Sequence, residues 1–157
     1  MISIHVMLCI FIILFAIIGA MRGWAKEILV TFSVILALFT LNVFQTFVPF
    51  FKEVVEKSSA ESLFWIRTGI VTALVFFGYQ TPKLQRLAES GRFMRNVLQD
   101  TLLGGVLGAV NGYMVFGTIW YFLHNSGYPF PFVSAPDPAT ANGLTALTWI
   151  NFLPPSW

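Results

Sequence analysis

Charged residues are scarce in this chain. Lys, Arg, Asp and Glu make up 10% of the 157 residues, whereas soluble domains carry about 25%. So few charges cannot cover a water-facing surface of this size, and 57% of the residues are hydrophobic. Lipid is the solvent that fits this composition, and aromatic residues suit both the apolar band and the interfacial belts of a membrane protein. The formal net charge of +2 is too small to indicate a nucleic-acid partner.

Residues that carry chemistry are also few. Cys9 is the single cysteine, so no internal disulfide can form, and its place in an apolar run is typical of a small buried hydrophobe. His5 and His124 are the two histidines, which is fewer than a metal site needs. The sequence has no nucleophile–base pair, phosphate-binding loop or paired intramembrane carboxylates. We therefore predict no enzymatic activity and no cofactor, with a chlorophyll-type pigment on His5 or His124 as the open alternative.

Four long apolar runs predict an all-α membrane protein. A helix needs about 20 apolar residues to cross a hydrocarbon core about 30 Å thick, because it rises about 1.5 Å per residue. The expected spans are residues 2–20, 28–51, 63–79 and 102–123. They form one predicted transmembrane domain over residues 1–123, followed by a tail over residues 124–157.

Basic residues are distributed unequally between the two sides of this predicted bundle. The connections at 21–27 and 80–101 lie on one side and hold two and four Lys or Arg residues, six in all, against Lys52 and Lys57 on the other side. Short loops rich in Lys and Arg stay in the cytoplasm. We therefore predict that both termini face the outer side of the membrane.

The third connection has a helical pattern of its own. Apolar residues recur at helical spacing in 83–98, and its basic residues lie elsewhere on the helical wheel: Arg86, Arg92 and Arg95. This pattern predicts a basic amphipathic helix on the cytoplasmic leaflet before the last span. An ordinary solvated linker helix is the alternative.

Glycines mark two further features. Gly23 is predicted to close a tight turn between the first two spans, since glycine tolerates positive φ, with Arg22 and Glu27 on either side. In the last span, residues four apart share one helix face, and the glycines with this spacing are Gly104, Gly108 and Gly112. Small residues let helix backbones approach closely in lipid. The face is thus predicted to pack against another helix, either of this chain or of a partner.

Polar residues inside the spans are candidates for function by default. Arg67 lies near the outer end of the third span, so we predict that it snorkels to the interface or pairs with Glu61, in preference to a transport role. Asn42, Gln45 and Asn111 are predicted to form hydrogen bonds between helices.

The tail is rich in proline and aromatic residues, unlike a disordered segment. It is predicted to lie against the membrane or a partner. Asp137 and Pro138 have the residue types of a helix cap and first helical position. The short helix that they would begin has Leu144, Leu147 and Ile150 on its expected apolar side.

Two motifs resemble a known family. The turn Arg22-Gly23-x-x-Lys26-Glu27 and the stretch Asp100-x-x-x-Gly104-x-x-x-Gly108-x-x-x-Gly112 are similar to motifs of the CvpA, or colicin V production protein, family, and the resemblance covers roughly residues 1–123. This chain departs from the family's pattern near Ser3, where an Asp is usual, and at Thr101 and Asn111, where an Arg is common. The resemblance implies a bacterial inner-membrane protein linked to bacteriocin export and envelope homeostasis, with no accepted biochemical activity.

The leading hypothesis from the sequence is a non-catalytic scaffold or accessory subunit of a larger membrane complex. That complex would concern bacteriocin export or the envelope, or a photosynthetic or respiratory assembly. Partner subunits would dock through the glycine face or the C-terminal tail. The alternatives are a small transporter or channel component, and an envelope- or lipid-homeostasis factor that senses anionic lipid through residues 83–98.

Overall fold

The computed structural model describes residues 3–80 and 97–156, and these residues form helices without a strand. Each of the four long helices is long and apolar enough to cross a membrane: α1 (Ile4–Arg22), α2 (Trp24–Phe47), α4 (Ala60–Gln80) and α6 (Val97–Asn125). The predicted all-α fold with four spans is confirmed. The predicted amphipathic helix lies outside the described residues except for its last two positions, and Arg86, Arg92 and Arg95 lie outside them too.

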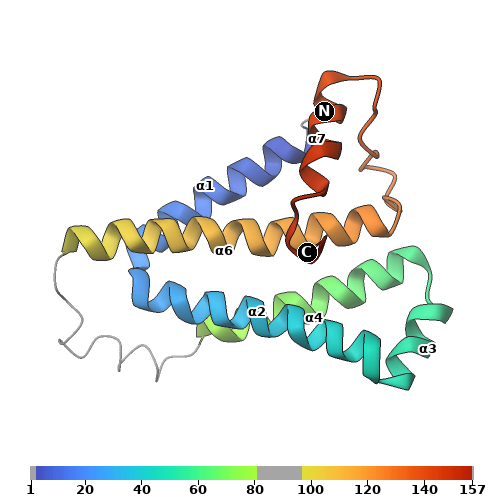
Figure 1. The fold of residues 1–157 in the computed structure, drawn as a ribbon, viewed down its shortest axis with the longest axis horizontal. Coiled ribbons are helices and arrows are strands. Elements are labelled where there is room, and N and C mark those ends of the chain that lie inside the picture. The colour runs from blue at the N-terminus through green and yellow to red at the C-terminus, as the bar shows by residue number, and fades with distance from the viewer. Residues whose placement is uncertain (1–2, 81–96, 157) are drawn as a thin grey trace.

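The chain runs up and down through the bundle, with α6 as its central helix (Figure 1). α1 packs along one side of α6, while α2 and α4 pack on each other and on another side of it. The Gly23 turn lies at one end of the bundle. The opposite end carries α3 (Pro49–Lys57) and α7 (Ala141–Ile150), and we call it the α3 end.

The second span ends earlier than the predicted 28–51. Val48 has extended backbone angles (φ −100°, ψ 106°), and Pro49 begins the separate helix α3. Proline has no N–H to continue a helix and disfavours helical angles in the residue before it. The exposed ion pair between Lys57 and Glu53 (2.5 Å) gives α3 a charged side, and Phe51 packs near Phe44 of α2. These features are typical of a helix at the membrane interface.

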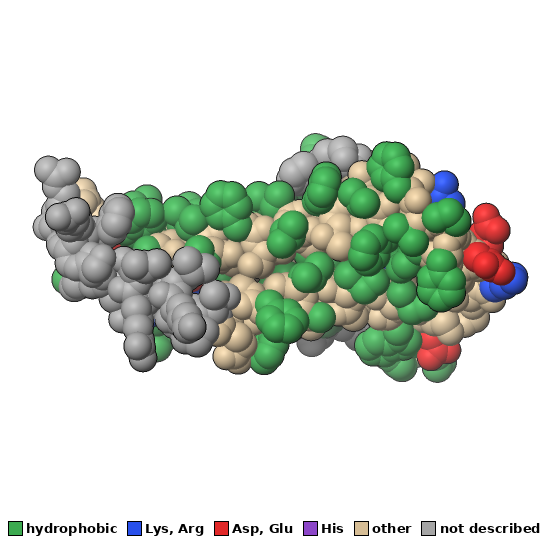
Figure 2. Space-filling view, turned by 90° about the horizontal axis from the view of Figure 1, so that it is seen from below, with side chains coloured by type: hydrophobic (Ala, Val, Ile, Leu, Met, Phe, Trp, Pro, Cys, Tyr) green, Lys and Arg blue, Asp and Glu red, His purple; other side chains and the backbone are tan. Residues whose placement is uncertain are grey.

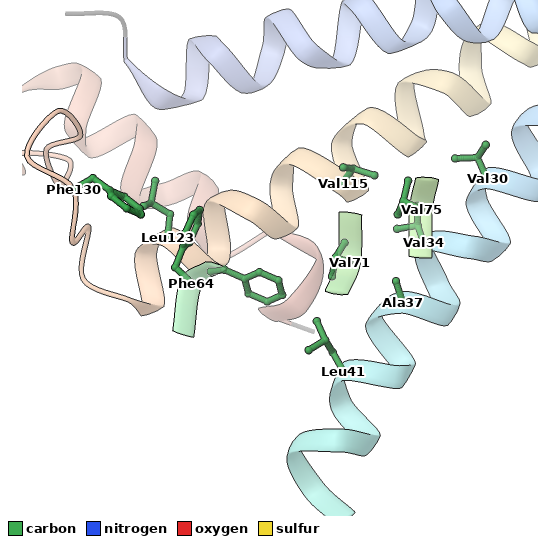
Figure 3. Close-up of a cluster of buried hydrophobic side chains, with 11 residues drawn as sticks. Val30, Val34, Ala37, Leu41, Phe64, Val71, Val75, Val115, Leu123 and Phe130 are labelled. Carbon is green, nitrogen blue, oxygen red and sulfur yellow. The ribbon is translucent and has the colours of Figure 1, made fainter. Parts of the chain in front are cut away.

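A cluster of small branched side chains holds α2, α4 and α6 together (Figure 3). α2 contributes a buried face at helical spacing: Val30, Val34, Ala37 and Leu41. This face meets Val71 and Val75 of α4 and Val115 of α6. Many large apolar side chains remain on the outside, among them Phe32, Phe39 and Phe77. Figure 2 shows this apolar surface along the bundle, with charged side chains gathered at one end. Such a surface suits contact with lipid.

The short helix in the tail begins later than predicted. Asp137 caps a turn instead, because its Oδ1 accepts from the N–H of Ala139 at 2.9 Å. α7 then begins at Ala141, and the side chain of Thr140 accepts from the N–H of Gly143 at 3.1 Å. An N-cap side chain of this kind satisfies a helix donor that has no partner within the helix.

The buried face of α7 agrees in part with the predicted one. Ile150 is buried and Leu147 packs against the same cluster, as predicted, whereas Leu144 is exposed and the small residues Gly143 and Ala146 are buried instead. This packing requires a glycine at position 143, because a Cβ there would lie 2.6 Å from the carbonyl carbon of Asp137.

The inner side of the tail covers the chain's own helices. Ala146, Ile150 and Leu153 form a buried cluster with Leu8 of α1 and Trp120 of α6. The chain ends in a 3₁₀ turn, η1 (Pro154–Ser156), which contacts α6. The surface that the tail covers therefore belongs to this protein, and only its outer side is open to the membrane or a partner.

Candidate functional site

The turn between α1 and α2 is completed by a side chain from α6. Gly23 adopts φ 86°, a left-handed conformation that favours glycine, and a Cβ there would lie 2.6 Å from Asp100 Oδ2. Asp100 Oδ1 accepts from the backbone N–H of Trp24 at 3.1 Å. Gly23 has no side chain to cap α2, so the carboxylate of Asp100 takes this role, favoured by the positive end of the helix dipole.

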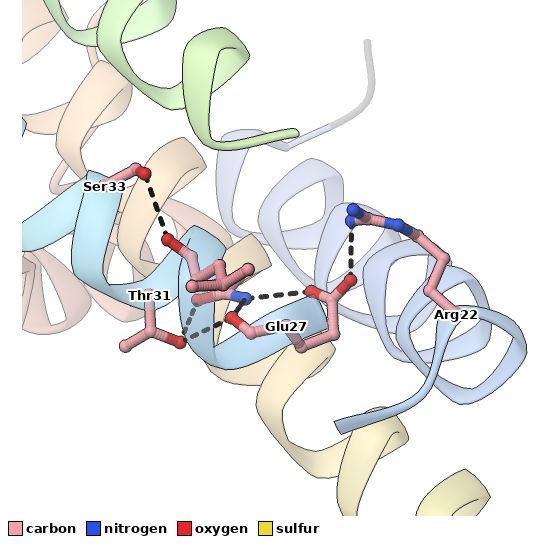
Figure 4. A network of polar contacts seen from close by, with 6 residues as sticks. Arg22, Glu27, Thr31 and Ser33 are labelled. Atoms are coloured by element: carbon pink, nitrogen blue, oxygen red, sulfur yellow. Dashed lines mark hydrogen bonds and ion pairs between the residues drawn. The ribbon is translucent and has the colours of Figure 1, made fainter. Parts of the chain in front are cut away.

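Glu27, one turn into α2, is fully buried (0% exposed). Arg22 Nη1 donates to Glu27 Oε1 at 2.7 Å (Figure 4). The guanidinium of Arg22 also lies over the ring of Tyr79 from α4, 4.3 Å from its centroid. A planar cation can pair with a carboxylate and stack on an aromatic face at the same time, so Arg22 links α1 to both α2 and α4.

The second oxygen of Glu27 is bound from α6. Asn111, also fully buried, donates its side-chain amide to Glu27 Oε2 at 2.9 Å and to the Glu27 backbone carbonyl at 3.0 Å. The hydroxyl of Thr31 is placed to donate to Asn111 Oδ1 at 2.8 Å or to the same backbone carbonyl at 3.0 Å. We call Arg22, Glu27, Thr31, Tyr79 and Asn111 the Glu27 network.

This network joins all four spanning helices near the Gly23 end. A buried charge is costly unless it is paired and its remaining lone pairs are bound. Both carboxylate oxygens of Glu27 meet this condition through donors of the same chain. The sequence singled out Arg22 and Glu27 as parts of the Gly23 turn and Asn111 as a polar residue in a span, and the structure brings these side chains together.

The glycine face of α6 is filled by α1. A Cβ on Gly108 would lie 2.9 Å from Gly19 Cα, and one on Gly112 would lie 2.7 Å from Phe15 Cβ. The Cβ of a residue at Gly104 would meet the backbone of Gly19 and Gly23. Of the two alternatives, packing within the chain is the one that the structure contains. Sequence reasoning missed Gly19. Its spacing of four residues from Gly23 is the same signal that marked the glycines of the last span.

The two sequence motifs thus meet across the bundle, Asp100 on the turn at Trp24 and Asn111 on Glu27. The sequence model of the colicin V production protein family matches residues 4–140. The chain belongs to this family. Comparisons with curated proteins and with solved structures gave no significant match.

The resemblance to the colicin V production family leads one to expect an arginine before the third glycine, where this member has Asn111. The structure gives a reason why a neutral donor suffices here. Arg22 already neutralises Glu27, so a second buried cation would leave one positive charge uncompensated. The amide of Asn111 binds Oε2 without adding charge.

Arg67 does not pair with Glu61. The two residues are six positions apart on α4, so their side chains point about 120° apart, and neither takes part in an ion pair among the described residues. Asn42 and Gln45 do not form the predicted hydrogen bonds between helices within the described part of the chain. Instead, all three polar residues line a cavity of about 560 Å³ towards the α3 end. α2 and α6 diverge towards this end (Figure 1), which separates the amides from donors across the bundle.

The histidines lie apart from this site. His5 Nδ1 lies 2.7 Å from the hydroxyl of Ser3, and the ring of His124 packs edge-on near Tyr128. The residues that the structure describes contain no group of three or more His, Cys, Asp or Glu side chains placed to hold a metal ion.

Proposed function

We propose that this member of the colicin V production family is a non-catalytic scaffold or accessory subunit of the bacterial inner membrane. The observation that carries the proposal is the Glu27 network. A catalytic or transporting carboxylate must exchange partners during its work. Both oxygens of Glu27 are bound by Arg22 and Asn111, which come from separate helices, so these contacts stabilise the fold. The family is described as colicin V production protein, and we propose that the scaffold role serves that process.

The partner surface that we propose is the outer side of the tail. The glycine face is occupied by α1, so it offers no room for a partner helix. On the tail, Phe132, Leu144 and Phe152 are exposed and lie outside the four spans. Aromatic residues of this kind are enriched where proteins bind one another.

Complementation of a deletion strain separates a structural role of the network from a chemical one. Glu27→Ala leaves Arg22 without its carboxylate, and breaking a buried pair costs about 3–5 kcal/mol. Glu56→Ala, on the exposed side of α3, is the matched control. We expect the amount of folded Glu27→Ala protein in the membrane to fall, and bacteriocin release to fall by the same proportion. The Glu56→Ala control should match the wild type in both.

A second variant tests the partner surface. Phe132→Ala combined with Phe152→Ala should lower release while the membrane level stays normal, whereas Phe32→Ala, exposed on α2, should change neither. The scaffold proposal is wrong if Glu27→Ala accumulates and unfolds like the wild type but abolishes release. In that case the carboxylate itself acts in the process.

A further inference from the structure

The cavity towards the α3 end has walls of two kinds. It lies among α2, α4, α6 and η1, and Arg67, Asn42 and Gln45 supply polar groups from α4 and α2. α6 adds the polar side chains of Tyr121 and Asn125. The rest of the lining is apolar and comes from α2, α6 and η1: Ile35, Leu38, Phe39 and Leu41, Met114 and Phe122, and Pro154 and Pro155. A cavity of about 560 Å³ falls within the range of small-molecule sites, about 300–1,000 Å³.

Arg67 gives this cavity a positive charge. Its Nε is enclosed and has no hydrogen-bond partner within the described part of the chain. The described residues that line the cavity include no carboxylate, and the ion pairs of the described residues leave Arg67 out. A guanidinium in a membrane-spanning helix is costly unless an anion or a strong acceptor meets it. Its planar set of donors matches the oxygens of a phosphate or carboxylate.

The apolar wall indicates what carries the anion. Ile35 and Phe39 of α2 line the cavity and stay 51% and 63% exposed, so the cavity is open beside apolar side chains of a spanning helix that lipid would surround. A ligand that binds Arg67 can therefore continue along these side chains with an apolar chain. A free phosphate ion would leave the apolar part of the cavity unfilled.

We propose that this cavity binds one anionic phospholipid. The phosphate pairs with Arg67. Asn42 and Gln45 bind the polar headgroup, and an acyl chain lies along Ile35 and Phe39. A zwitterionic lipid fits less well, because its ammonium group would lie beside Arg67 with no carboxylate among the described lining residues to meet it. This site is independent of the scaffold role and of the Glu27 network.

Titration of detergent-purified full-length protein tests the proposal. The titrants are short-chain phosphatidylglycerol, short-chain phosphatidylcholine and inorganic phosphate, with binding followed by thermal shift and native mass spectrometry. We expect phosphatidylglycerol to bind most tightly. Arg67→Gln should weaken it about tenfold or more, since a hydrogen bond to a charged group is worth at least that ratio. Lys57→Gln removes one positive charge from exposed α3 and should leave the affinity unchanged.

Gln45→Leu keeps Arg67 and provides a second variant if Arg67→Gln does not fold. It should weaken phosphatidylglycerol binding by a smaller factor. The proposal fails if phosphatidylglycerol binding is unaffected by both cavity variants, or if phosphatidylcholine binds equally well. If inorganic phosphate alone binds as tightly as the lipid and depends on Arg67, the ligand is a free anion and the lipid assignment is wrong.

Discussion

Two charged residues within the helices of the fold, Glu27 and Arg67, are accommodated in opposite ways. Glu27 is fully buried, and both its oxygens are bound by residues of the same chain. Arg67 is half-buried beside a cavity and has no hydrogen bond or ion pair within the described part of the chain. A fully bound charge stabilises one arrangement of the helices, whereas a charge beside a cavity favours a ligand of opposite sign. The first therefore supports a structural role and the second a binding role.

Asn111 offers a test of the Glu27 network that leaves every charge in place. Asn111→Leu is similar in size but removes the donor to Glu27 Oε2. Leaving a buried carboxylate oxygen unsatisfied costs about 1–3 kcal/mol, so we expect a lower unfolding temperature in detergent. Asn142→Leu, at an exposed position of α7, serves as the control and should unfold like the wild type. An unchanged unfolding temperature for Asn111→Leu would show that the hydrogen bond contributes nothing to stability.

Single residues could be singled out from sequence better than their partners could. Glu27 stood out beside the predicted Gly23 turn, and Asn111 stood out as a polar residue in a span. The contact between them joins residues 84 positions apart. Hydrophobic periodicity shows which face of a helix is apolar, but it does not show which other helix that face meets. The same limit applies to Arg67, for which the sequence predicts either snorkelling to the interface or a pair with nearby Glu61.

At the scale of elements, the four spans were predictable because length and apolar composition determine them. The element ends were less so. The apolar run of α2 continues through Phe50 and Phe51, and its pattern did not reveal that Pro49 ends one helix and begins another. Likewise, Asp137-Pro138 has the residue types of a helix start, yet the backbone of Asp137 lies against Gly143, and α7 begins only after that turn.

The contact between α1 and α6 depends on glycines from both helices. Gly108→Ala would place a Cβ 2.9 Å from Gly19 Cα and against the backbone of Phe15. Overpacking of this kind costs about 1–3 kcal/mol, and lipid provides little hydrophobic force to offset it. We expect a reduced membrane level and a lower unfolding temperature, even when the protein is expressed alone.

Gly69→Ala is the matched control for that substitution. Gly69 also lies within a spanning helix, but nothing lies within 4 Å of a Cβ added there. Alanine favours a helix over glycine by up to about 1 kcal/mol, so this variant should be as stable as the wild type or slightly more. Equal stability of the two variants would mean that α1 and α6 do not pack as closely as the structure shows.

The whole molecule has a different chemistry at its two ends. The Glu27 network lies near the Gly23 end, the polar cavity lies towards the α3 end, and buried valines of α2, α4 and α6 occupy the space between them. A transporter needs polar groups that lead from one side of the membrane to the other. The buried valines separate the polar groups at the two ends, so this arrangement favours a lipid-binding scaffold over the transporter alternative.

The distribution of charge predicts the orientation of the bundle in the membrane. Four spans place both termini on the same side of the membrane, together with α3 (Figure 1). The connections on the opposite side hold six Lys and Arg residues, against Lys52 and Lys57 on the α3 side, and such a bias keeps the basic connections in the cytoplasm. A reporter that is active only in the periplasm should therefore be active after Trp157 and within residues 52–57, and inactive within 83–98. The reverse pattern would invert the orientation and place the cavity of Arg67 in the cytoplasmic half of the membrane.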